Sequence, residues 1–462
     1  MAFNYLSLRY FQMIQQLRFY FASDGLGSTL VRALVGSAGV RIVGMVFGFL
    51  VGIQLARGLG AAGYGVYGIA MSIISLITIP TEFGLPQLVT REVAAAQVRN
   101  NGALIRGVLH CANRTVILLS VSMTVAGLVS WLLFKERLSA GVAITLLAGL
   151  PLVPLVALGN LRGAALRGLQ QIVRGQLPEV VLRPAVFSLL LLLASVLLPS
   201  GLSPMIAMVM QTIAAGVTLL VASLMLRCFL PEIHSASVPA IHAKTWLRSA
   251  LPMALTEGMR MLHGNVSILL LSAFSTSVIV GVFRVATSMG LLLTMPVTLL
   301  HVVSAPVFSR LHAAGDHKRL QRMLSWVAAA MVTGVVLVTL PFVLVGPQLL
   351  ANVFGAEFGS SNAPLLILSA GTLISSAFGA GATLLNMAGY ERRVTRAFGL
   401  SLIVLGLLSV PFIKLWGAVG AALANSIAFI LWSMLMWLDA RRLLYLDTSV
   451  VPLVKSGLRI RR

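Results

Sequence analysis

The sequence predicts an all-α integral membrane protein with about twelve transmembrane helices in two six-helix lobes. Its composition, the placement of its basic residues and an internal repeat support this prediction. Of the 462 residues, 58% are hydrophobic and only 10% are charged, whereas about 25% are charged in a typical soluble protein. Twelve helices of roughly 20 residues would use a little over half of the chain. That leaves short connections and no large extramembrane domain.

Apolar stretches long enough to cross a bilayer recur along the whole chain. We expect spans at about 35–56, 64–87, 114–134, 140–160, 180–199, 204–226, 250–272, 279–304, 325–346, 364–388, 397–415 and 418–438. Before them, in segment 1–32, Leu6, Tyr10 and Met13 recur at helical spacing opposite Arg9 and Gln12. This pattern predicts an amphipathic helix on the cytoplasmic surface of the membrane.

The basic residues test both the number of spans and their orientation. The formal net charge is +22, which in a soluble protein would suggest nucleic-acid binding. In a membrane protein, however, Lys and Arg collect in cytoplasmic loops. With the N-terminus inside, 27 of the 34 Lys and Arg residues fall in cytoplasmic segments and only 4 in outside segments. A wrong helix count would scramble this alternation. The pattern therefore predicts that both termini are cytoplasmic and argues against a nucleic-acid partner.

The two halves of the sequence repeat at a shift of 216 residues, without a gap over the first two spans. The matched pairs include Arg32 with Arg248, Gly48 with Gly264, Gly65 with Gly281, and Pro80 with Pro296. Because six spans separate the copies, both have the same orientation, which predicts a parallel repeat about an axis along the membrane normal. We expect lobes at 33–228 and 245–440, a cytoplasmic linker at 229–244 and a basic cytoplasmic tail at 441–462.

Six stretches along the chain carry a family resemblance. They are LARGLGAAGYGVYGIA at 55–70, FGLPQLVTREVA at 83–94, ALRGLQQ at 165–171, VFGAEFGSSNAPLLIL at 353–368, LLNMAGYERR at 384–393 and GAVGAALANSIAF at 417–429. Together they resemble the polysaccharide transporter family of the multidrug/oligosaccharidyl-lipid/polysaccharide (MOP) flippase superfamily. The resemblance implies a MATE-like fold in a bacterial inner membrane and no enzymatic activity.

The same resemblance implies a function and partners. Such proteins move undecaprenyl-pyrophosphate-linked oligosaccharide units from the cytoplasmic to the periplasmic leaflet by alternating access, for O-antigen, capsule or exopolysaccharide assembly. The implied partners are the lipid-linked oligosaccharide and polysaccharide polymerase machinery. The basic loops add anionic membrane lipids as a partner, and we expect a monomer.

Three arginines within the predicted spans are candidate substrate-binding residues: Arg41, Arg260 and Arg284. A charge at mid-bilayer costs about 2.5–3.5 kcal/mol on insertion scales, so it should face a cavity or a partner. Guanidinium groups bind phosphate oxygens through a bidentate fork. We therefore expect these arginines to attract a pyrophosphate or acidic sugars. The alternative is that they pair with nearby carboxylates or reach toward an interface.

Ion coupling is assigned to Glu257, His263 and Glu82. Glu257 occupies the repeat position of Arg41, so the two could form an ion pair that opens and closes with the cavity. Glu257, Arg260 and His263 are spaced by three residues on one helix face, and such a group could carry protons. A static Glu257–Arg260 pair is the alternative, and Glu82 could instead be interfacial.

Hinge positions are predicted at Gly44, Gly48, Pro80 and Pro296. Glycines at four-residue spacing allow close helix packing, and proline can kink a helix. Alternating access requires helices that bend or rock. The same residue types also occur in static bundles, so both interpretations stay open.

The functional alternatives differ in the residues that they require. The sequence has no GxxxxGK[ST], CxxC or HExxH motif, so we expect no cofactor and no metal site. A drug or cation antiporter of the same superfamily needs a carboxylate-rich cavity, whereas arginines outnumber glutamates within the spans. The family pattern of peptidoglycan-precursor flippases has fourteen spans. Only 23 residues follow Asp439, which are too few for two further spans. A membrane polymerase or glycosyltransferase would need a larger external loop.

Overall fold

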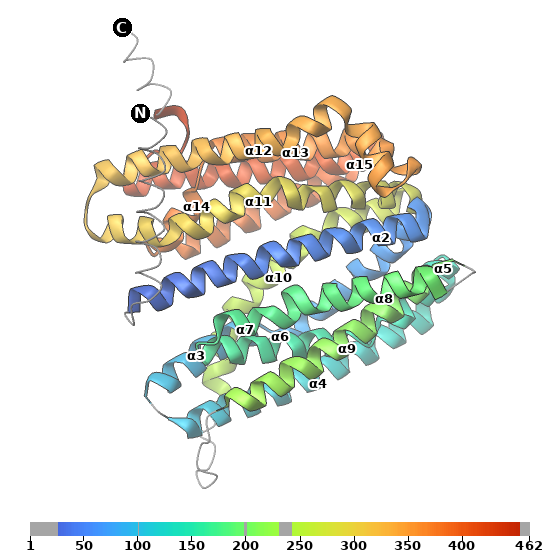
Figure 1. Ribbon diagram of the computed structural model, residues 1–462, viewed down its shortest axis with the longest axis horizontal. Helices are drawn as coiled ribbons and strands as arrows, with labels where there is room; N and C mark the ends of the chain where they lie inside the picture. The colour runs from blue at the N-terminus through green and yellow to red at the C-terminus, as the bar shows by residue number, and fades with distance from the viewer. Residues whose placement is uncertain (1–25, 100, 198–200, 231–242, 453–462) are drawn as a thin grey trace, which may run out of the picture.

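The computed structural model describes residues 26–99, 101–197, 201–230 and 243–452, and all regular secondary structure within them is helical. The elements are α2 (Leu26–Glu82), α3 (Leu85–Val98), α4 (Gly102–Phe134), η1 (Lys135–Arg137), α5 (Ala140–Gly149), α6 (Leu152–Gly168), α7 (Ile172–Leu177), η2 (Pro178–Leu182), α8 (Arg183–Leu197), α9 (Pro204–Phe229), α10 (Ala243–Phe274), α11 (Ser277–Ala313), α12 (His317–Phe354), η3 (Ala356–Ser361), α13 (Asn362–Ala377), α14 (Gly381–Met387) and α15 (Glu391–Leu444). In Figure 1 helices α3–α9 form one group, helices α11–α15 form another, and α2 and α10 run between them.

The long apolar helices confirm an all-α integral membrane protein. Within the described residues, eight helices are long and apolar enough to span a membrane, or nine when the bent pair formed by η3–α13 and α14 counts as one. Two of the longest contain two predicted spans each. α2 breaks at Gly60, where φ is 65° and ψ is 178°. α15 breaks at Gly417, where φ is 55° and ψ is −124°. These backbone angles suit glycine alone.

Several predicted boundaries differ from the observed ones. α2 begins at Leu26, before the predicted span start at about 35, and α15 continues to Leu444, past the predicted span end at about 438. In both cases polar residues at the edge of an apolar run continue the helix, because ending it requires a breaking residue rather than a change in polarity. The rest of the predicted surface helix, most of the linker and residues 453–462 of the tail lie outside the described residues.

The contact between α2 and α11 follows the 216-residue repeat. A Cβ atom on Gly65 would lie 1.8 Å from the carbonyl oxygen of Ser277, and one on Gly281 would lie 2.1 Å from that of Ala61. Ala61 and Ser277 are themselves 216 positions apart. The contact is therefore self-complementary, as a two-fold relation requires. Only glycine lets the two backbones approach this closely.

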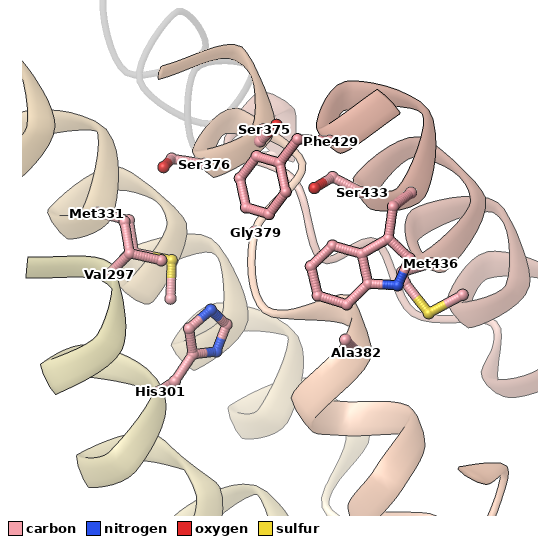
Figure 2. A pocket seen from close by; sticks show the side chains of 11 residues that line it. Val297, His301, Met331, Ser375, Ser376, Gly379, Ala382, Phe429, Ser433 and Met436 are labelled. Carbon is pink, nitrogen blue, oxygen red and sulfur yellow. The ribbon is translucent and has the colours of Figure 1, made fainter. Parts of the chain in front are cut away.

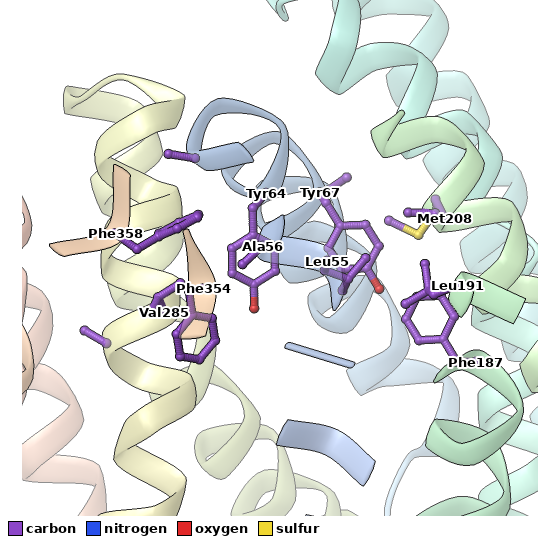
Figure 3. Close-up of a cluster of buried hydrophobic side chains, with 14 of the residues drawn as sticks. Leu55, Ala56, Tyr64, Tyr67, Phe187, Leu191, Met208, Val285, Phe354 and Phe358 are labelled. Carbon is purple, nitrogen blue, oxygen red and sulfur yellow. The ribbon is translucent and has the colours of Figure 1, made fainter. Parts of the chain in front are cut away.

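Residues 26–230 are the first half of the molecule, and residues 243–452 are the second half. A large cluster of buried side chains joins the two near the Gly65–Gly281 crossing. Figure 3 shows Tyr64 and Tyr67 of α2 between Phe354 and Phe358 on one side and Phe187 and Met208 on the other. The rings of Tyr64 and Phe358 meet edge to face, with centroids 6.4 Å apart. Burial of these rings closes this end of the molecule.

A polar latch, formed by Arg57 and Glu357, reinforces the closed end. Arg57 Nε donates a hydrogen bond to the carbonyl oxygen of Val353 at 2.8 Å, and Arg57 Nη2 donates to that of Asn352. In return, Glu357 Oε2 accepts a hydrogen bond from the backbone N–H of Ala61 at 2.8 Å. Since Ala61 directly follows the Gly60 break, Glu357 satisfies a free N–H at the start of the next helix.

Candidate functional site

Two pockets of about 250 Å³ each lie where elements of the first half meet α10 or α11. We name the first the glutamate pocket, lined by Glu82, Asn160, Arg167, Glu257 and Arg260. α2 and α6 supply the first three of these residues and α10 the last two. Ionisable groups from both halves therefore share one cavity inside a predominantly apolar molecule.

The groups in the glutamate pocket are largely paired. Glu82 is only 6% exposed, and its Oε1 accepts a hydrogen bond from Asn160 Nδ2 at 2.6 Å. Arg260 Nε lies 3.1 Å from Glu257 Oε2, and a second bond joins Arg260 Nη2 to Glu257 Oε1. The Arg260 side chain is nevertheless 67% exposed. A fork held by one carboxylate and otherwise open can accept an anionic ligand.

The second cavity is the tyrosine pocket, defined by Tyr64, Tyr67, Glu179, Arg183 and Arg284. The guanidinium carbon of Arg284 lies 5.5 Å and 5.6 Å from the ring centroids of Tyr64 and Tyr67. Arg284 Nη1 donates to the carbonyl oxygen of Gly68 at 3.3 Å, while its Nε has no partner among the described residues. Arg284 is thus held by cation–π contacts with donor capacity left over.

The facing wall of the tyrosine pocket carries a second ion pair, between Glu179 and Arg183. Their Oε2 and Nη1 atoms are 3.2 Å apart. Glu179 lies in the π-helical segment η2, where the backbone N–H of Arg183 donates to Pro178 O. Pro184 lacks an N–H, so the regular helical ladder is interrupted here. Such π-helical turns are frequent at functional sites, and this one orients the pair toward the cavity.

The predicted arginines occupy different surroundings. Arg260 lines the glutamate pocket and Arg284 the tyrosine pocket. Arg41 is exposed on α2 and lines neither pocket. In this conformation Glu257 pairs with Arg260, its neighbour on α10. The local pair that the sequence left as an alternative is therefore the one present, and the predicted Arg41–Glu257 pair is not formed in this state.

The predicted coupling residues do not share one cavity. Glu82 and Glu257 line the glutamate pocket, whereas His263 lines a separate pocket within the second half. Its Nδ1 has no partner among the described residues, and its ring centroid lies 5.3 Å from that of Phe398. The three-residue spacing places these groups along one helix, but the neighbouring helices divide them between two cavities.

The predicted hinge residues are parts of continuous helices. A Cβ on Gly44 would lie 2.4 Å from the carbonyl oxygen of Val180, so Gly44 provides a close contact with η2. Gly48 faces open space and lines the tyrosine pocket. α2 and α11 stay helical through Pro80 and Pro296, while the non-helical angles in α2 fall at Gly60. Hinge motion at the four positions stays a prediction.

Three of the seven charged groups in the two pockets, Arg167, Glu179 and Arg183, were not among the predicted site residues. Arg167 and Arg183 are among the 27 basic residues that the sequence places in cytoplasmic segments, and no role was predicted for Glu179. Glu179 and Arg183 are spaced by four residues beside Pro178 at the start of a predicted span. That spacing favours a helical ion pair, and it was the available signal. Arg167, whose Nη1 donates to Gly175 O at 3.2 Å, offered no comparable pattern.

A small cavity in the second half is lined by His301 (Figure 2). Its volume is about 40 Å³, which is room for one water molecule. His301 Nδ1 lies 2.6 Å from Thr383 Oγ1. In Figure 2 Ser375, Ser376 and Ser433 gather near Phe429, and His301 lies across the cavity from them. This cavity is lined entirely by second-half residues and is separate from the two charged pockets.

Comparison with known proteins identifies the family. Residues 32–312 match the family model described as "Polysaccharide biosynthesis protein". The chain belongs to this family. The prediction of a polysaccharide transporter of the MOP superfamily is thereby confirmed. A curated relative of this family member is stage V sporulation protein B of Bacillus subtilis (strain 168), 27% identical over 187 residues. That match covers 38% of the chain and 34% of the relative, about a third of the relative's length.

Solved structures show the same fold. The inward-facing conformation of a multidrug resistance MATE family transporter of the MOP superfamily superposes with a TM-score of 0.72 at 14% identity, covering 88% of this chain and 97% of that one. Lipid II flippase MurJ in an inward closed conformation gives a TM-score of 0.66 at 13% identity, covering 88% and 87%. At these identities the likeness establishes the architecture of this family member.

Proposed function

We propose that this protein is a flippase that moves a lipid-linked oligosaccharide with an anionic pyrophosphate across the membrane by alternating access. The observation that carries the proposal is the placement of Arg260 and Arg284 in polar pockets where the two halves meet. Guanidinium groups stay charged when desolvated and match phosphate geometry. Family membership supports a role in polysaccharide biosynthesis, by transport rather than by an enzymatic reaction.

The charge of the two pockets supports an anionic substrate. Together they contain the arginines Arg167, Arg183, Arg260 and Arg284 and the glutamates Glu82, Glu179 and Glu257. Four arginines against three glutamates leave an excess of one positive charge when all are ionised. The ion pairs Glu179–Arg183 and Glu257–Arg260 leave the site open to a ligand, because an incoming phosphate can replace the carboxylate at the same guanidinium.

The repeat supports two moving lobes, which we place at 33–228 and 245–440. The self-complementary crossing of Gly65 and Gly281 lies on the implied axis. Breaking α2 at Gly60 and α15 at Gly417 divides each into two spans. With these divisions, the bent α13–α14 pair and α10, the helices accommodate the twelve predicted spans. We propose that the lobes rock about the crossing, as expected for parallel repeats.

The resting conformation follows from the latch and the predicted topology. The basic-residue pattern puts Arg57 and Glu357 on the outside. The structure closes that end with the latch and the aromatic cluster. We infer an inward-facing state, in which Arg260 receives the carrier lipid from the cytoplasmic leaflet of a bacterial inner membrane. Undecaprenyl as the lipid, the polymer pathway and proton coupling through Glu257, His263 and Glu82 belong to the same proposal.

Transport in proteoliposomes tests the proposal. The substrate is lipid-linked oligosaccharide extracted from host cells and labelled on the glycan. Charged hydrogen bonds contribute about 1.5–3 kcal/mol, so Arg260→Ala and Arg284→Ala should each slow transport by about tenfold or more. The matching lysine variants should recover part of the rate. Arg393→Ala, which removes an exposed arginine outside the pockets, is the control.

Three results separate the alternatives. Loss of transport in both alanine variants with a normal Arg393→Ala rate supports the flippase. Unchanged transport in both alanine variants contradicts the proposed site. Export of a cationic dye without any movement of the lipid-linked oligosaccharide would instead identify a drug antiporter.

A further inference from the structure

The pocket that His263 lines lies within the second half, and its wall is polar without being charged. We name it the neutral pocket. It has a volume of about 270 Å³, and its lining includes His263, Gly264, Thr287, Gly290, Thr372 and Phe429. α10, α11, α13 and α15 each contribute to it. Its described lining contains no Asp, Glu, Lys or Arg. A pyrophosphate therefore finds no countercharge in this cavity.

The neutral pocket and the tyrosine pocket share two lining positions that are related by the 216-residue repeat. Gly264 lines the neutral pocket and Gly48 the tyrosine pocket, and the two glycines are 216 positions apart. Thr287 and Met71 form a second such pair. α11 lines both cavities, with Arg284 in one and Thr287 in the other. The two cavities thus adjoin along one turn of α11.

The wall of the neutral pocket has unused hydrogen-bonding capacity. Thr287 Oγ1 donates to the carbonyl oxygen of Arg284 at 2.9 Å, and Thr372 Oγ1 donates to that of Leu368 at 2.8 Å. Each hydroxyl oxygen can still accept a hydrogen bond. His263 Nδ1 has no partner among the described residues. Buried polar atoms are normally satisfied, so the unpartnered His263 Nδ1 indicates a hydrogen-bonding ligand or water.

An aromatic ring completes the wall. Phe429 lines both the neutral pocket and the small His301 cavity, and Figure 2 shows its ring at the His301 cavity. Its ring centroid lies 5.6 Å from that of Trp432, and this contact holds it in place. Hydroxyl-binding groups beside a flat apolar ring suit a sugar, whose edges carry hydroxyls and whose faces carry C–H groups. The volume of about 270 Å³ leaves room for a sugar ring.

We propose that the neutral pocket binds a sugar ring of the transported oligosaccharide while Arg284 and Arg260 hold its anionic group. This assignment rests on the proposed flippase function and adds the place where the glycan is recognised. Two repeat-related cavities would then divide one substrate between them. Both halves contribute to the charged site, and the second half alone contributes the neutral one.

The experiment compares two lipids for each protein in lipid nanodiscs. One probe is sugar-free undecaprenyl pyrophosphate, and the other is lipid-linked oligosaccharide extracted from host cells. Native mass spectrometry gives a Kd for each. The combined variant Thr287→Val and Thr372→Val removes two hydroxyls at nearly constant shape. Thr395→Val is the control, because its hydroxyl also bonds to its own helix at Glu391 O but lies outside the pocket.

The wild-type protein should bind the oligosaccharide lipid about tenfold or more tightly than the sugar-free lipid, because several hydrogen bonds add up. The double variant should lose most of this ratio and keep its Kd for the sugar-free lipid. Gly290→Leu should act in the same way by filling the cavity, since a Cβ at Gly290 meets no atom within 4 Å. Thr395→Val should behave as the wild type.

Each other result has one meaning. Equal wild-type binding of the two lipids overturns the sugar site, as does a preference that survives in both Thr287→Val/Thr372→Val and Gly290→Leu. Equal weakening toward both lipids in these variants shows a structural role and also overturns it. Failure of the wild-type protein to bind either lipid contradicts the flippase function itself, which is a separate outcome.

Discussion

The two repeat-related cavities share a framework and differ in chemistry. Both are lined by a helix that carries an open glycine, Gly48 in the first half and Gly264 in the second. The tyrosine pocket holds Glu179, Arg183 and Arg284, whereas the described lining of the neutral pocket is uncharged. The two cavities therefore share repeat-related positions but differ in the charge of their walls. Position within a repeat indicates where a site lies, and the side chains decide what it binds.

Single repeat positions show how the asymmetry arises. Arg260 of α10 corresponds to Gly44 of α2, and Arg284 of α11 corresponds to Gly68. At Gly44 the carbonyl oxygen of Val180 leaves no room for a side chain. Gly68 contacts Arg284 itself, which lies 2.7 Å from where a Cβ would stand. In the second pair, α11 provides the guanidinium of Arg284. α2 provides the space beside Gly68 and the Gly68 carbonyl oxygen to which Arg284 donates.

The largest expected effect comes from disturbing the symmetric crossing. Gly281→Val would place a branched side chain against the Ala61 carbonyl, where even a Cβ would lie at 2.1 Å. Overpacking against backbone cannot be relieved by a rotamer change, so we expect a loss of about 3 kcal/mol or more in stability. Thermal unfolding in detergent measures it. Gly216→Ala is the control, because its Cβ meets no atom within 4 Å. Equal Tm values for the two variants would contradict the crossing.

A smaller effect is expected where the Arg284 side chain of the second half packs against Gly68 of the first half. Gly68→Val would displace the Arg284 side chain without altering its charge. Because small misplacements of a binding group are costly, we expect transport to fall by about tenfold with little change in Tm. The rate in proteoliposomes, compared with that of Gly216→Ala, is the measurement. A wild-type rate would show that the position of Arg284 does not matter for transport.

The smallest effect concerns a feature of the second half, the turn that follows α15. Partial burial favours the neutral form of Asp447, but hydrogen bonds from Ser449 and Trp437 outweigh it and hold the pKa of Asp447 below its usual range. The ionised form therefore stabilises the fold above the unfolded-state pKa of about 3.9. This contribution is lost as the pH falls through the lower folded-state value.

Asp447→Asn should consequently lose about 1 kcal/mol at neutral pH and show a shallower fall of Tm between about pH 5 and pH 2. Scans of Tm against pH for both proteins provide the test. Ser360→Ala, which changes an exposed hydroxyl near the opposite end of α13, serves as the control. Parallel Tm profiles for Asp447→Asn and the wild type would exclude this role of Asp447.

The fold was predictable to the extent that it depends on local composition. Apolar runs and basic loops indicated an all-helical membrane protein. The 216-residue shift matched Gly65 with Gly281 as repeat positions, and the structure adds that the two are in contact. The pockets were less predictable because they depend on contacts between distant helices. The sequence places Arg183 in a cytoplasmic segment, but in the structure it lines a cavity. The sequence places Arg41 within a span, but in the structure it is exposed. Charge in a sequence reports the cost of burial, but the partner that offsets this cost comes from another helix.

The latch at Arg57 has a consequence for sequence drift. Its guanidinium donates to the main-chain oxygens of residues 352 and 353, and Glu357 accepts from the main-chain nitrogen of residue 61. The side chains at 352 and 353 take no part in this fastening. Substitutions there leave the same carbonyls in place, so related proteins can vary in that stretch and still close it, provided an arginine and a glutamate remain at the two anchoring positions.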